Sequence, residues 1–130
     1  MKASFQVMNS ICQLLLTLLS LALFTACSAP EDSLKHLGQT PFDKNAWAQA
    51  NQEGRGAMAY DLIKKVQSEK LNSEQIKDLL GQPTGYFDYD ETPAYFVGPQ
   101  TVTSQYGKGY LIAFPFDPQT AYPLTPVVIP

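Results

Sequence analysis

Histidine and cysteine are scarce in this 130-residue chain, which has one histidine, His36, and two cysteines, Cys12 and Cys27. Ser-His-Asp and Cys-His arrangements need a histidine as base, and histidine-based metal sites need several such ligands. The chain also has no glycine-rich phosphate-binding motif. We therefore expect a protein that is not an enzyme, with no catalytic residue, no bound cofactor and no metal site.

Positive charge is also limited. Nine Lys and Arg residues stand against twelve Asp and Glu residues, a formal net charge of −3. Nucleic-acid binding depends on a basic surface that neutralises phosphates, so we expect no nucleic-acid partner. An acidic chain is also repelled by anionic lipid heads, and attachment to a membrane would need something other than a basic patch.

The one long apolar run, ICQLLLTLLSLALFTA, occupies residues 11–26 and follows a start with Lys2 and no acidic residue. This pattern is typical of a secretory signal peptide, and the run is shorter than the ~20 residues that a membrane-spanning helix needs. A buried core helix is the alternative, but the run is apolar on all sides and a domain this small has little core to surround it. We expect residues 1–26 to be a signal peptide.

Cys27 directly follows this run. The stretch FTAC at residues 24–27 resembles the lipobox of bacterial lipoproteins, with Phe24 where leucine is usual. The resemblance implies cleavage before Cys27 and diacylglycerol transfer to its sulfur. Removal of residues 1–26 also removes Cys12, so Cys27 keeps no partner for an internal disulfide. Lipid attachment at Cys27 is our leading interpretation, with a soluble secreted product or a redox or catalytic thiol as alternatives.

The residues after Cys27 indicate a location and a spacer. Ser28 is not the aspartate that typically retains such lipoproteins at the inner membrane, so the resemblance implies the periplasmic face of the outer membrane. Residues 27–40, CSAPEDSLKHLGQT, mix Pro, Gly, Ser and both charges without a sustained period, which predicts a flexible tether. Residues 41–130 are expected to form one globular domain.

Two helices are predicted in the first half of that domain. Apolar residues recur at helical spacing over about residues 55–68, and Gly54 and Gly56 are expected to separate this helix from the segment of Trp47. We interpret Trp47 as a packing residue, with a ligand platform as the alternative.

The second predicted helix is Ser73–Leu80. Asn72 is the expected N-cap, Gln75 completes a capping box, and Gly81 with the following proline ends the helix.

Aromatic-rich runs separated by turn residues follow. GYFDY at 85–89 and PAYFVG at 93–98 flank a short acidic connection and predict a hairpin. GYLIAFPF at 109–116 predicts a further strand, and the proline-rich run 121–130 predicts an edge strand because proline cannot donate to a ladder. The expected fold is α+β, with two N-terminal helices packed on a three- to four-stranded antiparallel sheet.

Five residues are candidates for partner contact. Tyr86, Tyr95 and Tyr110 would lie on an aromatic face of the sheet, and Tyr106 and Lys108 belong to the long irregular segment 98–109.

An acidic group at the hairpin tip, Asp88, Asp90 and Glu91, suggests a cation site or an acid/base pair. Acidic residues at such a tip are usually only solvated, which is the competing interpretation.

Three stretches, RGAMAYDLIKK, IKDLLGQPTGYFDYDETPAYFVGP and YGKGYLIAFPFD, resemble the small lipoproteins of the SmpA/OmlA (BamE-like) and β-lactamase-inhibitor-like fold group and cover most of residues 55–117. The most specific piece is DLLGQP, because the second helix in that group passes through Leu-Gly-x-Pro into the first strand. The turn between the helices lacks the glycine that the group often has. The resemblance implies a non-enzymatic α-α-β-β-β domain, with or without a fourth strand, at the outer membrane that works by protein contact.

The leading hypothesis is a lipid-anchored interaction module on the periplasmic face of the outer membrane. It would attach to the membrane through Cys27, bind another envelope protein and support envelope assembly or integrity. An inhibitor of a periplasmic hydrolase of the lysozyme or β-lactamase type, and a small-ligand or cation-binding lipoprotein, are the alternatives.

Overall fold

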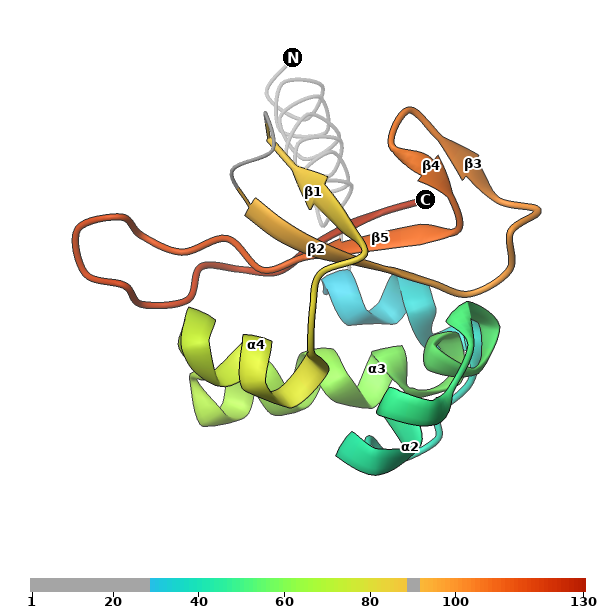
Figure 1. The fold of residues 1–130 in the computed structure, drawn as a ribbon, viewed down its shortest axis with the longest axis horizontal. Coiled ribbons are helices and arrows are strands. Elements are labelled where there is room, and N and C mark those ends of the chain that lie inside the picture. The colour runs from blue at the N-terminus through green and yellow to red at the C-terminus, as the bar shows by residue number, and fades with distance from the viewer. Residues whose placement is uncertain (1–28, 89–91) are drawn as a thin grey trace, which may run out of the picture.

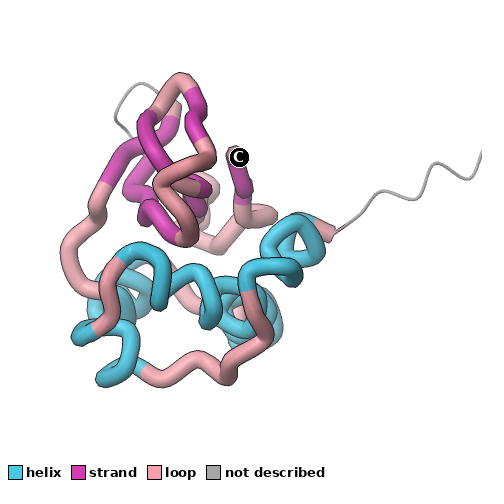
Figure 2. Tube along the Cα trace, turned by 90° about the vertical axis from the view of Figure 1, so that its right-hand side faces the viewer, coloured by secondary structure: helices cyan, strands magenta, loops and turns pink. Residues whose placement is uncertain are grey.

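The chain folds into a layer of helices packed against an antiparallel sheet, as a computed structural model shows for residues 29–88 and 92–130 (Figure 1). The helices lie below the sheet in Figure 1, and Figure 2 shows the same two layers from the side. The α+β prediction is confirmed. The expected signal peptide and Cys27 lie outside the described residues. Across the two described ranges, no helix is both long and apolar enough to cross a membrane.

The first element among the described residues is a 3-10 helix, η2 (Pro30–Leu37), within the segment that we expected to be a flexible tether. Leu34 is fully buried in the core, and Leu37 packs against it. Gly38 then approaches Ala57 so closely that a Cβ would lie 2.9 Å from the Ala57 Cα. The tether prediction is wrong for this segment, because two apolar side chains at 3-10 spacing are enough to dock it but leave no recognisable period in the sequence.

Two helices follow, α2 (Lys44–Gln49) and α3 (Gln52–Glu69). Asn51 begins α3, since its side chain accepts a hydrogen bond from the Gly54 N–H at 2.8 Å. The predicted helix is therefore confirmed but starts earlier than expected. Gly54 and Gly56 lie inside the helix. The expectation that they separate it from the segment of Trp47 is wrong, because the break lies between Gln49 and Gln52.

Gly56 is required by packing rather than by a turn. A Cβ on this residue would lie 2.7 Å from the Gly98 Cα, where α3 crosses the chain just after the second strand. A missing side chain lets the two backbones approach closely, and this contact outweighs the low helix propensity of glycine.

Trp47 is fully buried, which confirms that it is a packing residue. Its indole Nε1 donates a hydrogen bond to the Leu80 carbonyl oxygen at 3.2 Å. The guanidinium of Arg55, a residue of α3, lies over the indole ring at 5.1 Å from its centroid. Trp47 thus joins α2 to both neighbouring helices.

The next helix is α4 (Ser73–Leu80), with the predicted bounds. The Asn72 side chain accepts from the Gln75 N–H, and the Gln75 side chain accepts from the Asn72 N–H, each at 2.9 Å. This reciprocal pair is the predicted capping box, and it is confirmed.

The main sheet has the strand order β1-β2-β5-β6 with every pair antiparallel, and a separate small sheet pairs β3 with β4. The strands are β1 (Gly85–Phe87), β2 (Thr92–Val97), β3 (Thr103–Ser104), β4 (Gly107–Lys108), β5 (Tyr110–Ala113) and β6 (Val127–Ile129). The hairpin of β1 and β2 is confirmed. The last strand pairs with β5 at the edge of the sheet, as its prolines predicted.

Each face of the main sheet has its own apolar cluster. The helices cover the face that carries Tyr95, Val97, Ile112 and Phe114. The opposite face buries Ala94, Leu111 and Ala113 beneath Phe87, Phe96 and Tyr106. The β3–β4 hairpin lies over this second face, because a Cβ on Gly107 would be 2.9 Å from the Phe96 ring.

Candidate interaction groove

The structure places the predicted sheet aromatics on one face, but that face is the one the helices cover. Opposed residues of an antiparallel pair share a face, and the register pairs Tyr86 with Pro93 and Tyr110 with Val97. Tyr95 lies between them in β2 and is 1% exposed. The expected exposed aromatic face therefore does not exist: of the three tyrosines, Tyr86 alone is well exposed, at 48%, on the edge strand.

Tyr95 has a structural role instead. Its hydroxyl donates a hydrogen bond to the Gly81 carbonyl oxygen at 2.9 Å, which fixes the end of α4 above the sheet. Burial disfavours the charged phenolate and raises the pKa of Tyr95 to about 12, against an opposing effect of the Arg55 charge. The side chain therefore stays protonated over the physiological range.

Tyr110 contacts the one histidine of the chain. Its hydroxyl lies 3.0 Å from His36 Nε2, and the two rings meet edge to face with centroids 5.6 Å apart. His36 is thus carried onto the domain by η2. Tyr110 is half-buried by this contact, which links η2 to the sheet and occupies the hydroxyl expected to meet a partner.

Tyr106 and Lys108 lie on the β3–β4 hairpin. Tyr106 is partly buried against Phe87, with ring centroids 5.7 Å apart. Lys108 is exposed, and its carbonyl oxygen accepts from Gln52 Nε2 at 2.9 Å. The predicted irregular loop therefore contains a short hairpin, in which Tyr106 packs and Lys108 remains accessible.

The acidic hairpin tip is only partly described. Asp88 is exposed and has a left-handed φ of 55°, while Asp90 and Glu91 lie outside the described residues. Within residues 29–88 and 92–130, no three His, Cys, Asp or Glu side chains form a group that could hold a metal ion.

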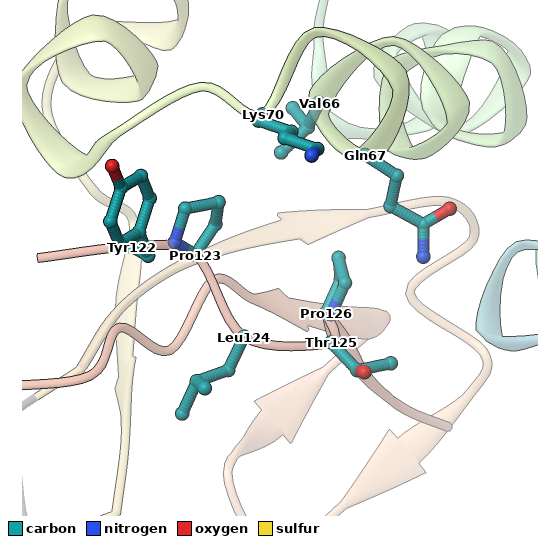
Figure 3. Close-up of a pocket in the computed structure, with 8 residues that line it drawn as sticks. All are labelled: Val66, Gln67, Lys70, Tyr122, Pro123, Leu124, Thr125 and Pro126. Carbon is teal, nitrogen blue, oxygen red and sulfur yellow. The ribbon is translucent and has the colours of Figure 1, made fainter. Parts of the chain in front are cut away.

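An open groove of about 440 Å³ lies between the C-terminal part of α3 and the chain at 122–126 (Figure 3). The helix contributes Val66 and Gln67, and Lys70 directly follows its end. In Figure 3 the rings of Pro123 and Pro126 face the helix, and the Lys70 side chain points into the space between the walls. The walls of the groove are therefore mixed, with proline and aromatic surface beside the polar side chains of Gln67 and Thr125, and Lys70 is the one cation that lines it.

Tyr122 and Leu124 make this region the most exposed apolar part of the described surface. Their exposed fractions are 68% and 51%. The backbone that carries them is held in place: the Leu124 N–H donates to the Pro115 carbonyl oxygen at 2.9 Å, and the Asp117 N–H donates to the Tyr122 carbonyl oxygen at 3.0 Å. A rigid backbone that presents large exposed apolar side chains is typical of an interaction surface.

A smaller apolar hollow of about 210 Å³ opens between α4 and the sheet, lined by Ile76, Pro93, Tyr95, Phe114 and Phe116 with polar residues of α4 at its rim. Phe116 of this hollow forms an isolated backbone bridge with Pro123 of the groove, so one residue pair joins the linings of the two hollows.

Sequence reasoning missed Tyr122 and Leu124. The available signal was the alternation of prolines with Tyr122, Leu124 and Val127 in the stretch AYPLTPVV. Proline removes ladder donors, which excluded a central strand but left open whether the side chains between the prolines face the core or the solvent.

The chain was compared with protein-family models, with curated proteins and with solved structures, and none of the three comparisons gave a match.

Proposed function

We propose that this protein is a lipid-anchored, non-enzymatic interaction module on the periplasmic face of the outer membrane, where it binds another envelope protein and supports envelope assembly or integrity. The observation that carries the proposal is the groove with its exposed Tyr122 and Leu124. The lipobox-like stretch before Cys27 supports the anchor.

The groove favours a peptide-like occupant. Proline and aromatic walls suit an extended or helical segment with apolar anchor residues, and large buried anchors contribute most of the energy at such interfaces. Lys70 favours a segment with a carboxylate close to the anchors, because opposite charges select register and partner.

The order of elements supports the finer fold proposal, a BamE-like and β-lactamase-inhibitor-like arrangement. Two helices, α3 and α4, precede the antiparallel run of β1, β2 and β5, in the order that the resemblance implies. In this chain η2, α2 and the β3–β4 hairpin are added to that frame, and β6 corresponds to the optional last strand.

The membrane anchor is tested by the mass of the N-terminal peptide. The mature protein should begin at Cys27 and carry acyl chains on it, and Cys27→Ser should release the protein from the membrane fraction. A wild-type protein that begins elsewhere, or that carries no lipid, would contradict the anchor.

The groove is tested by photo-crosslinking in intact cells. A benzophenone amino acid in place of Tyr122 should give one specific product with an envelope protein, and Lys70→Glu should weaken that product. A benzophenone at Tyr86, the other strongly exposed tyrosine, is the matched control. A product from Tyr86 alone would place docking on the β1 edge, and no specific product from either position would contradict an interaction module.

The hydrolase-inhibitor alternative has its own measurement. Purified protein at high excess should leave lysozymes and β-lactamases of a broad panel uninhibited. Tight inhibition of one of them would replace the assembly role by an inhibitory one.

A further inference from the structure

The ordered domain begins very close to the proposed lipid anchor. Pro30 is already part of η2, and only Ser28 and Ala29 separate it from Cys27. Consecutive Cα atoms lie ~3.8 Å apart, so the Cα of Pro30 is at most ~11 Å from that of Cys27. An acylated Cys27 thus keeps the start of η2 at the level of the lipid headgroups, a step that rests on the proposed anchor.

The other end of η2 carries positive charge that the tertiary structure concentrates. The Lys35 Nζ of η2 and the Lys64 Nζ of α3 lie 5.6 Å and 5.1 Å from the centroid of the Tyr60 ring. We call Lys35, Tyr60 and Lys64 the basic patch. Both lysines are exposed, and neither belongs to the ion pairs found among residues 29–88 and 92–130.

The basic patch is suited to an anionic oxygen. Two ammonium groups lie within 5.6 Å of the centroid of one ring, and the ring face compensates only part of their charge. Headgroup phosphates beside the two ammonium groups would compensate the rest. The rest of the chain is acidic overall. Removal of residues 1–26 takes away one of nine basic residues and none of the twelve acidic ones, which leaves a formal charge of 8 − 12 = −4.

The two ends of η2 differ in charge, so only the last turn is attracted to phosphates, and the first turn depends on the acyl chains. Glu31 and Asp32 lie in its first turn, next to the anchor, and Lys35 and His36 lie in its last turn. A 3-10 helix rises ~2.0 Å per residue, so Lys35 is about 10 Å along the helix from Pro30. Acyl chains hold one end of η2, and the basic patch is available to hold the other.

We propose that the face of the domain formed by η2 and the adjoining part of α3 lies flat on the lipid surface, with the ammonium groups of the basic patch on headgroup phosphates. The anchor makes this second contact intramolecular, so a weak interaction is sufficient. Figure 2 shows η2 and α2 at opposite sides of the helical layer, joined by residues 38–43. The proposal therefore directs α2 away from the membrane.

The orientation is tested with acylated full-length protein in vesicles of equal parts phosphatidylethanolamine and phosphatidylglycerol that contain a headgroup-nitroxide lipid. Ser33→Cys in η2 and Asn45→Cys in α2, both exposed positions, each receive a fluorophore. Quenching at position 33 should exceed quenching at position 45 severalfold. Equal quenching, or stronger quenching at position 45, would overturn the proposal.

The contribution of the basic patch is tested in the Ser33→Cys background. Lys35→Glu combined with Lys64→Glu should make the difference in quenching between positions 33 and 45 clearly smaller, although the anchor still keeps the start of η2 near the headgroups. The matched control, Lys44→Glu with Lys77→Glu, reverses two exposed lysines of α2 and α4 and should leave quenching unchanged. Equal effects of the two pairs, or no effect of either, would overturn the headgroup contact.

The same samples separate the orientation from the anchor. A Cys27 without lipid would take up a second fluorophore, and the protein would leave the vesicles, which contradicts the anchor and the orientation together. An acylated, vesicle-bound protein with equal quenching at the two positions contradicts the orientation alone.

Discussion

Leu34→Ala should destabilise the protein strongly, although it lies in a segment whose composition suggests a tether. The Leu34 side chain is fully buried among the residues of the main core. Removal of a buried leucine side chain down to alanine costs about 3–5 kcal/mol when the surrounding structure does not collapse into the cavity. The loss cannot exceed the free energy with which η2 docks. A larger cost would detach η2, and the remaining domain would then unfold in a separate step.

The change is measured by thermal and denaturant unfolding of the purified protein in mild detergent. A loss of about 3 kcal/mol corresponds to a decrease of roughly 12–24 °C in Tm for a domain of this size. Asp32→Ala, an exposed position in the same helix, is the control and should change the unfolding free energy by less than ~0.5 kcal/mol. If Leu34→Ala behaves like the control, η2 is not docked and the reasoning is wrong.

Three further changes test other contacts. Gly56→Ala should destabilise by about 1–3 kcal/mol, because its Cβ would lie 2.7 Å from the Gly98 Cα, whereas Ser68→Ala on the exposed side of the same helix should be nearly neutral in denaturant unfolding. Asn72→Ala should lower the unfolding free energy by about 1 kcal/mol through loss of the cap, and an unchanged denaturation midpoint would contradict the capping box. Burial raises the pKa of Tyr95 from 10.0 to about 12 in the folded state, so the unfolded state loses the proton first. The unfolding free energy should therefore hold below pH 10 and fall as the pH rises towards 12, a fall that Tyr95→Phe should reduce.

The local elements were predictable where short-range chemistry decides them. The stretch NSEQIKDLLGQP contains the cap, the apolar positions and the stop signal of α4, and each acts within a few residues. The β1–β2 hairpin and the edge position of β6 follow from the same kind of reasoning, since turn residues and missing proline donors act on their immediate neighbours.

The positions of η2 and the start of α3 were predicted wrongly because tertiary packing outweighed local preference. Burial of Leu34 and Leu37 docks a polar segment, and Gly56 lies in a helix because a crossing backbone at Gly98 needs the space. Sequence periodicity reports neither effect, since both depend on residues distant in the chain.

The candidate surfaces were decided by the tertiary structure in the same way. Both faces of the central strands are apolar in sequence, so period alone did not determine which face the helices cover. The register of β2 on β5 places Tyr95 beneath the helices, and the path of the last residues exposes Tyr122 instead.

The sequence by itself determined the helix caps, the hairpin, the edge strand and the lipobox-like stretch before Cys27, because those depend on covalent neighbours. Only the tertiary structure decided that η2 belongs to the domain, that Lys35 and Lys64 meet at Tyr60, and that the exposed apolar groove lies between α3 and the C-terminal segment. These features arise from side chains far apart in the chain, and packing of the common core sets their distances.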